Sequence, residues 1–135
     1  MRRGVAPVGP GDALRARVPD VLRTYQETRE TVLESGIVDP ELKRLCARYL
    51  NGDPELAEFE ESDRFDERQR AALAWAHAIA WDPELAGDAL WQRLHEHFSE
   101  PELVELGYSM AMIHGQLRWL RTFGLETAEE NLLSP

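Results

Sequence analysis

The segment from Ala71 to Trp81 (AALAWAHAIAW) restricts the possible folds more than any other part of the chain. Its eleven residues are almost all apolar, and His77 is the only ionisable side chain among them. A helix that is apolar on every side must also be covered on every side. We therefore expect this segment to form the central helix of the fold, with several other helices packed around it.

Further helices are indicated by capping residues and by apolar residues at helical spacing. The expected elements are, in order, a short helix capped by Asp12, a helix from Pro19 that ends before Gly36, a helix capped by Asp39 that stops at Asn51, a turn with Leu56 and Phe59, the central helix capped by Asp66, a helix over about residues 88–97, and a last long helix opened by the Ser99 and Glu102 capping box. Alternation typical of strands is missing from the sequence. The predicted class is all-α, a small bundle of about five or six helices. Residues 1–10 indicate a flexible leader, and residues 11–135 a single domain.

The last long helix carries two apolar stripes. One stripe contains Leu103, Leu106, Met110, Ile113, Leu117 and Leu120, and the other contains Val104, Tyr108, Ala111, Trp119 and Thr122. Two apolar stripes on one helix need two partners, and in a chain of this size the second partner is often another subunit. The sequence therefore predicts a homo-oligomer.

Charge and cysteine content exclude several classes of function. The 135 residues include 25 acidic and 15 basic side chains, so the formal charge is −10, which argues against nucleic acid as a partner. Apolar runs are too short for a membrane span or a signal peptide, and we expect a cytoplasmic protein without a membrane partner. Cys46 is the single cysteine, which excludes an internal disulfide and a cysteine-rich zinc site.

Three stretches point to a known family: GIVDPELKRLCARYLNG, FDERQRAALAWAHAIA and HFSEPELVELGYSMAMIHGQLRWLRTFGL. Together they resemble the carboxymuconolactone decarboxylase and alkylhydroperoxidase-like family over about residues 20–126. In that family an acid-bearing helix enters the active centre, a helix like FDERQRAAL follows, and a segment like HFSEPELVEL opens the last helix. The resemblance implies the alkylhydroperoxidase-like arrangement of helices in an oligomeric protein.

The redox members of this family share the pattern Glu-x11-Cys-x-x-Cys-x-x-x-His. Glu41 matches the acid of that pattern, but the two cysteine positions fall on Asp53 and Leu56 and the histidine position falls on Glu60. The interval up to FDERQRAAL is also short for the family. Cys46 lies on an apolar helix face, where a lone cysteine is usually a small buried residue. The resemblance therefore implies a member without the thiol centre, and peroxidase activity is not expected.

The decarboxylase branch of the family lacks the cysteine pair and works by proton transfer on a lactone-acid substrate. This reaction needs an acid–base group and a cation that holds a carboxylate, which histidine and arginine supply. His114 and Arg118 lie four residues apart on the last helix and so share a face. Arg118 matches the family's terminal arginine, whereas His114 stands where an amide is more usual.

Each candidate residue also has a purely structural interpretation. His77 is either a hydrogen-bonded core histidine or a catalytic group, and Glu41 stabilises the helix dipole whether or not it also orients a histidine. Trp75 and Trp119 are either core and interface anchors or the walls of a ligand pocket between helices.

The leading hypothesis is an enzyme, a lyase or isomerase that needs no cofactor and no metal and acts on a small organic acid or lactone. His114 or His77 would move the proton, Glu41 would orient a histidine, Arg118 would hold the carboxylate, and Trp75 and Trp119 would contact the substrate. The alternative is a catalytically inert binding or scaffold subunit of the same fold.

Overall fold

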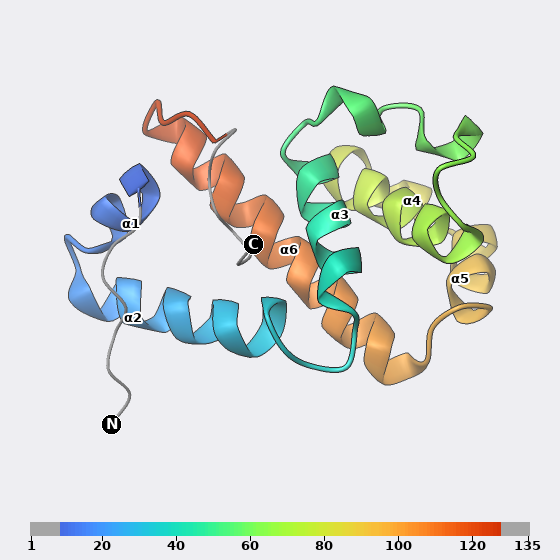
Figure 1. The fold of residues 1–135 in the computed structure, drawn as a ribbon, viewed down its shortest axis with the longest axis horizontal. Coiled ribbons are helices and arrows are strands. Elements are labelled where there is room, and N and C mark those ends of the chain that lie inside the picture. The colour runs from blue at the N-terminus through green and yellow to red at the C-terminus, as the bar shows by residue number, and fades with distance from the viewer. Residues whose placement is uncertain (1–8, 128–135) are drawn as a thin grey trace.

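The computed structural model describes residues 9–127, and within this range all regular structure is helical (Figure 1). Six α-helices form the framework and four short helical turns join them, so the predicted all-α class is confirmed. The elements are α1 (Gly9–Arg15), α2 (Pro19–Thr28), the π-helical turn η1 (Arg29–Leu33), α3 (Pro40–Leu50), the 3-10 turns η2 (Pro54–Leu56) and η3 (Phe59–Glu61), α4 (Glu67–Trp81), the 3-10 turn η4 (Pro83–Leu85), α5 (Asp88–His95) and α6 (Glu100–Thr122).

Three of the helix starts follow the sequence signals closely. The Asp39 side chain accepts a hydrogen bond of 3.0 Å from the first turn of α3. Asp66 and Gln69 form a capping box at α4, and Ser99 and Glu102 form the expected one at α6. These caps satisfy backbone N–H groups that have no partner inside a helix, so local sequence sets where each of the three helices begins.

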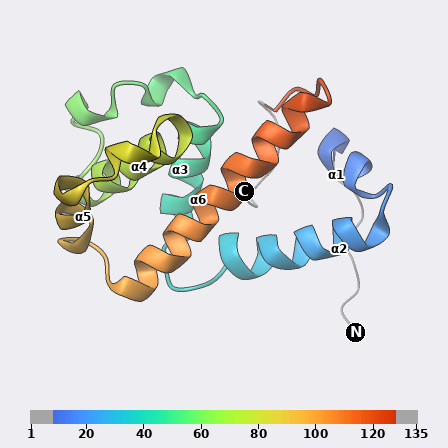
Figure 2. The same ribbon diagram turned by 180° about the vertical axis from the view of Figure 1, so that it is seen from behind.

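The core lies where α3 packs against both α4 and α6 (Figures 1 and 2). It is made almost entirely of aliphatic side chains, and each Leu or Ile buried in this way contributes roughly 1.5–3 kcal/mol relative to an exposed one. The side chains without solvent exposure include Leu33, Leu56, Leu73, Leu94, Leu106, Met110, Ile113 and Leu117. The core thus joins the elements from η1 to α6, except η4, which has no buried side chain.

The central helix α4 is covered over most of its length, as its composition predicts. Its buried side chains are Ala71, Ala72, Leu73, Ala76 and Ala78, while η3, η4 and α5 lie against its remaining surface. The expectation of burial on every side is wrong at the C-terminal end, where Trp81 is 75% exposed. The helix stops there because the chain turns into η4 at Asp82 and Pro83, which leaves the Trp81 side chain largely open to solvent.

The N-terminal helices differ from the sequence expectation in two ways. Asp12 does not cap a helix, because α1 already begins at Gly9 and Asp12 lies inside it, where its buried carboxylate pairs with Arg15 at 2.8 Å. The helix that begins at Pro19 ends before Gly36 as expected, but its last turn, η1, is π-helical. The predicted leader, residues 1–10, lies outside the described residues except for its last two positions.

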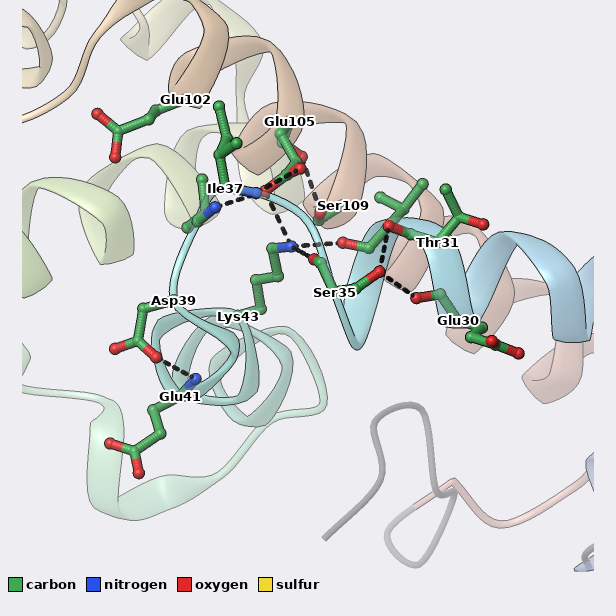
Figure 3. A network of polar contacts seen from close by, with 12 residues as sticks. Glu30, Thr31, Ser35, Ile37, Asp39, Glu41, Lys43, Glu102, Glu105 and Ser109 are labelled. Atoms are coloured by element: carbon green, nitrogen blue, oxygen red, sulfur yellow. Dashed lines mark hydrogen bonds and ion pairs between the residues drawn. The ribbon is translucent and has the colours of Figure 1, made fainter.

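A buried ion pair attaches this N-terminal part to α6 (Figure 3). The Lys43 ammonium has no solvent exposure, lies 3.0 Å from the Glu105 carboxylate, and donates to the carbonyl oxygens of Val32 and Ser35. Glu105 also accepts hydrogen bonds from the backbone N–H groups of Ile37 (3.1 Å) and Val38 (2.7 Å). The loop between η1 and α3 is therefore fixed to α6 by charge-assisted hydrogen bonds.

Gly36 in this loop allows the close approach. Its φ is +96°, and a Cβ at this position would lie 2.0 Å from a Glu105 carboxylate oxygen. Any other residue would carry backbone strain and displace that carboxylate from its partners.

Helix α6 separates the molecule into two parts, with α1 and α2 on one side and α3, α4 and α5 on the other (Figures 1 and 2). The six residues of its first predicted stripe are all buried. The second stripe is open to solvent, with Val104 71%, Tyr108 59% and Trp119 38% exposed. None of the helices in residues 9–127 combines the length and apolar character needed to cross a membrane.

Candidate functional site

His77 is held by a tyrosine, a partner that the sequence interpretation did not include. The Tyr49 hydroxyl, on the last turn of α3, lies 2.5 Å from Nδ1 of the half-buried His77 on α4. Phe59 packs edge-on against the Tyr49 ring at 5.6 Å, and Trp81 lies 6.5 Å from the His77 ring. The pair is therefore kept in place by aromatic contacts from η3 and from the end of α4.

The direction of this hydrogen bond depends on the tautomer of His77. Burial raises the pKa of Tyr49, so the phenol keeps its proton at neutral pH and can donate it to Nδ1 in the tautomer in which that nitrogen is unprotonated. A neutral imidazole that accepts at Nδ1 carries its own proton on Nε2. Nε2 of His77 makes no hydrogen bond to residues 9–127, so this side of the ring is available to a ligand.

A cavity of about 530 Å³ opens beside the pair. Its walls come from α3, η3, α4, η4 and α5, and most of the lining side chains are apolar. They are Tyr49, Ala57, Phe59, Glu60, Glu61, Ala74, His77, Leu85, Ala89, Leu90 and Arg93. This volume is typical of small-molecule sites, which combine an apolar wall with a few polar groups.

The charged groups of the cavity are dominated by acid. Arg93 donates two hydrogen bonds to the Glu60 carboxylate, at 3.0 and 2.7 Å, while Glu61 adds a second carboxylate to the lining. Because Glu60 holds Arg93 in a bidentate pair, the only cation of the lining is already neutralised. The cavity therefore suits an uncharged molecule better than an anion.

Glu41 and His77, which the sequence interpretation combined, meet different partners. Glu41 stands in the first turn of α3 with its carboxylate exposed (Figure 3). The residue of α3 that reaches His77 is Tyr49, two turns further on. Eight residues of helix span about 12 Å, so Glu41 and Tyr49 lie in different surroundings at the two ends of α3.

His114 and Arg118 lie on α6, outside the lining of the cavity at His77. Burial, together with the nearby Arg118 and Arg121 guanidinium groups, lowers the pKa of His114, so this imidazole is neutral at pH 7. Arg118 is exposed. His114 and Arg118 together still combine a base with a cation, but they line neither the cavity at His77 nor the one between α2 and α6.

The two tryptophans proposed as substrate contacts occupy separate places. Trp75 packs against Trp91 with ring centroids 5.5 Å apart, and it fills the space left by Gly107, where a Cβ would lie 2.6 Å from the indole. Trp119 lines a second cavity of about 470 Å³ between α2 and α6. Of the six residues predicted from sequence, only His77 lines the cavity beside Tyr49.

The positions matched to the family's redox residues have structural partners here. Asp53 caps η2 and pairs with Arg48 at 2.7 Å, Leu56 is fully buried in the core, and Glu60 binds Arg93. Cys46 has no solvent exposure, and burial raises the pKa of its thiol to about 12. Since the thiolate is the nucleophilic form, a thiol in this state does not attack a peroxide.

Within residues 9–127 there is no group of three or more His, Cys, Asp or Glu side chains arranged to hold a metal ion. Comparison with protein-family models, with curated proteins and with solved structures found no match in any of the three. The site is therefore interpreted from its own chemistry.

Tyr49, Glu60 and Arg93 were missed because sequence spacing does not reveal which helices meet. One signal for Tyr49 was available: a tyrosine on the apolar face of one helix and a lone histidine on an apolar helix each need a polar partner. The pairing of Glu60 with Arg93 joins residues 33 positions apart and had no such signal.

Proposed function

We propose that the chain is a carboxymuconolactone decarboxylase-like protein without the thiol centre, and that it works as a cofactor-independent, non-redox enzyme on a small organic acid or lactone. The Tyr49–His77 hydrogen bond at the wall of a cavity is the observation that carries this proposal. A linked phenol and imidazole are the groups that general acid–base catalysis needs.

The pair acts as one base in this proposal. The Tyr49 oxygen takes a proton from a substrate carbon next to a carbonyl, and the hydroxyl proton of Tyr49 moves to Nδ1 of His77. The product is the substrate enolate and an imidazolium, and reversal of both transfers returns the proton to another atom of the substrate. No electrons leave the substrate, so the overall reaction is an isomerisation or, where carbon dioxide departs, a decarboxylation.

Of the two substrate classes, the cavity favours the lactone. An acid would place its carboxylate beside Glu60 and Glu61, and the charge of Arg93 is already offset by Glu60. An uncharged ring with a carbonyl group meets no such repulsion. The apolar wall, which includes Phe59 and Leu90, supplies the burial that holds it.

The test is turnover of γ-lactones with and without a carboxylate, followed by ring absorbance and carbon dioxide release. Tyr49→Phe and His77→Gln are expected to lower kcat by about 10²- to 10⁴-fold with little change in KM. His95→Gln is the matched control, because that histidine is exposed and lies outside the cavity. Full activity in both Tyr49→Phe and His77→Gln would exclude the proposed base.

His114 and Arg118 remain the second candidate for the base and its cation, because the pKa of His114 keeps it neutral. Loss of turnover in His114→Gln with full activity in His77→Gln would favour them. Peroxide turnover with a thiol donor that depends on Cys46 would contradict the non-redox assignment.

The alternative function is a binding or scaffold subunit without catalysis. It is favoured by the Glu60–Arg93 pair, which leaves the cation of the cavity occupied by the chain itself. In that case no lactone is turned over, and Tyr49→Phe changes only stability or ligand affinity.

A further inference from the structure

The exposed face of α6 gathers several large apolar side chains that have no cover in the described part of the molecule. Val104, Tyr108, Trp119 and Phe123 are 71%, 59%, 38% and 56% exposed, and all four fall on one side of the helix. Val21 of α2, 46% exposed, lines the cavity between α2 and α6 together with Tyr108 and Trp119. The surface is therefore continuous from α6 onto α2.

The area of this face corresponds to that of a stable dimer. An aromatic side chain buries 150–250 Å², so the exposed parts of the three rings provide roughly 300 Å², and the neighbouring valines bring the total to roughly 500 Å². A standard interface buries about 800 Å² on each partner, and in homodimers about 65% of that is apolar. The face therefore offers about the apolar area that one such interface requires.

The charge on this face is compatible with a second copy of an acidic chain. Residues 106–125 contain no Asp or Glu, although the whole chain has 25 acidic residues and a net charge of −10. Most other surfaces would bring carboxylates of two copies together. Here the exposed Arg118 adds a cation to a face that has no carboxylate of its own.

The order of side chains along the face is symmetric. Bulky residues stand at both ends, and the small Ala111 and Gly115 stand between them. The pairs Val104 with Phe123 and Tyr108 with Trp119 have their midpoints between positions 113 and 114, and the pair Ala111 with Gly115 has its midpoint at position 113. A two-fold axis at this midpoint would set the small residues at the crossing of two antiparallel helices and each Tyr108 against a Trp119 of the other copy.

We infer that this face binds a second copy of the chain, with the two α6 helices antiparallel about a two-fold axis near position 113. The inference rests on α6 and its neighbours alone, and it holds whether or not the cavity at His77 is catalytic. The aromatic rings of each copy would also close the mouth of the other copy's cavity between α2 and α6.

Sedimentation velocity from 1 to 100 µM tests the association. A dimer is expected for the full chain, and monomers are expected for Tyr108→Glu and for Ala111→Glu, with unchanged helical circular dichroism. Leu85→Glu is the matched control, since this side chain is also 53% exposed but lies on η4, and it should remain dimeric. A monomeric full chain, or dimers that survive both α6 substitutions, would overturn the inference. A monomeric chain whose Trp119 fluorescence is quenched by 1-naphthol would show instead that the cavity between α2 and α6 binds a small aromatic molecule, and this result would also overturn the inference.

Cross-linking with a short bismaleimide tests the antiparallel arrangement. The two cysteines of the Ala111→Cys dimer would lie within roughly 10 Å of each other, close to the two-fold axis. The two cysteines of the Val104→Cys dimer would lie roughly 28 Å apart along the helices, at 1.5 Å per residue. Covalent dimers are therefore expected for the first variant and not for the second. The reverse result, or equal yields, would contradict the two-fold arrangement. Cys46 is buried and does not compete for the reagent.

Discussion

The two ends of α3 carry polar clusters of opposite character. Near its start, the ammonium of Lys43 has three donors and meets three acceptors, the carbonyls of Val32 and Ser35 and the carboxylate of Glu105. At its end, Tyr49 and His77 bind each other, His77 lines a cavity, and its Nε2 makes no hydrogen bond within residues 9–127. A cluster whose hydrogen-bond donors and acceptors are all paired stabilises the fold. A cluster that keeps an unpaired donor or acceptor can also bind a ligand and take part in a reaction.

The largest expected effect comes from breaking the closed cluster with Lys43→Met. The change leaves Glu105 and two buried carbonyls without their partner, so the free energy of unfolding should fall by about 3 kcal/mol, a large share of the 5–15 kcal/mol typical of a domain. Urea unfolding followed by circular dichroism measures it. The control is Arg48→Met on the same helix, whose exposed pair with Asp53 is worth less than about 1 kcal/mol. Equal losses in the two variants would contradict the comparison.

A smaller effect, with a distinct pH dependence, is expected for Glu105→Gln. Burial raises the pKa of Glu105, but the hydrogen bonds from Val38, Lys43 and Ile37 outweigh burial, and its pKa lies below the usual 4.5. The charged carboxylate therefore stabilises the fold above about pH 4.5, and this stability is lost as the pH falls through the lower folded-state pKa. We expect the variant to be about 2 kcal/mol less stable at pH 7. Unfolding series from pH 7 to pH 2.5 should show the difference vanish at the acid end, and a constant difference would exclude this role.

The smallest stability effect is expected at the open cluster. Tyr49→Phe removes one hydrogen bond and leaves a half-buried imidazole that water can reach, so the loss should be about 1 kcal/mol. Together with a large fall in kcat, this would show that the pair serves chemistry more than stability. The same urea series measures it, and a loss as large as that of Lys43→Met would assign Tyr49 and His77 to the structural class instead.

Local signals predicted the fold better than the site. Asp39, Asp66 and Ser99 act within one turn of a helix, and such short-range effects can be recognised in a sequence. The candidate site depends on α3, α4, α5 and η3 meeting in space, and spacing along the chain does not contain that information. His77 could be singled out because it interrupts an apolar helix, but Glu41 was assigned from its match to a family pattern, and the structure sets Tyr49 beside His77.

The burial of Lys43 likewise could not be predicted from spacing along the chain. A lysine among Leu42, Leu45 and Cys46 gave no indication that it would be completely buried. Its burial depends on two carbonyls left open where the π-helical turn ends, together with a carboxylate from a helix that begins nearly sixty residues later. These partners become visible only in three dimensions.

The π-helical turn η1 changes the angular phase of the helix that contains it. In a regular α-helix Leu22 and Leu33, eleven residues apart, would point in nearly the same direction, but a π turn takes up one additional residue and rotates the next residues of the helix by about 100°. Leu33 accordingly joins the main core, while Leu22 and Tyr25 are buried outside that cluster. One continuous helix thereby turns buried side chains in two directions, toward the main core at its end and away from that cluster nearer its start.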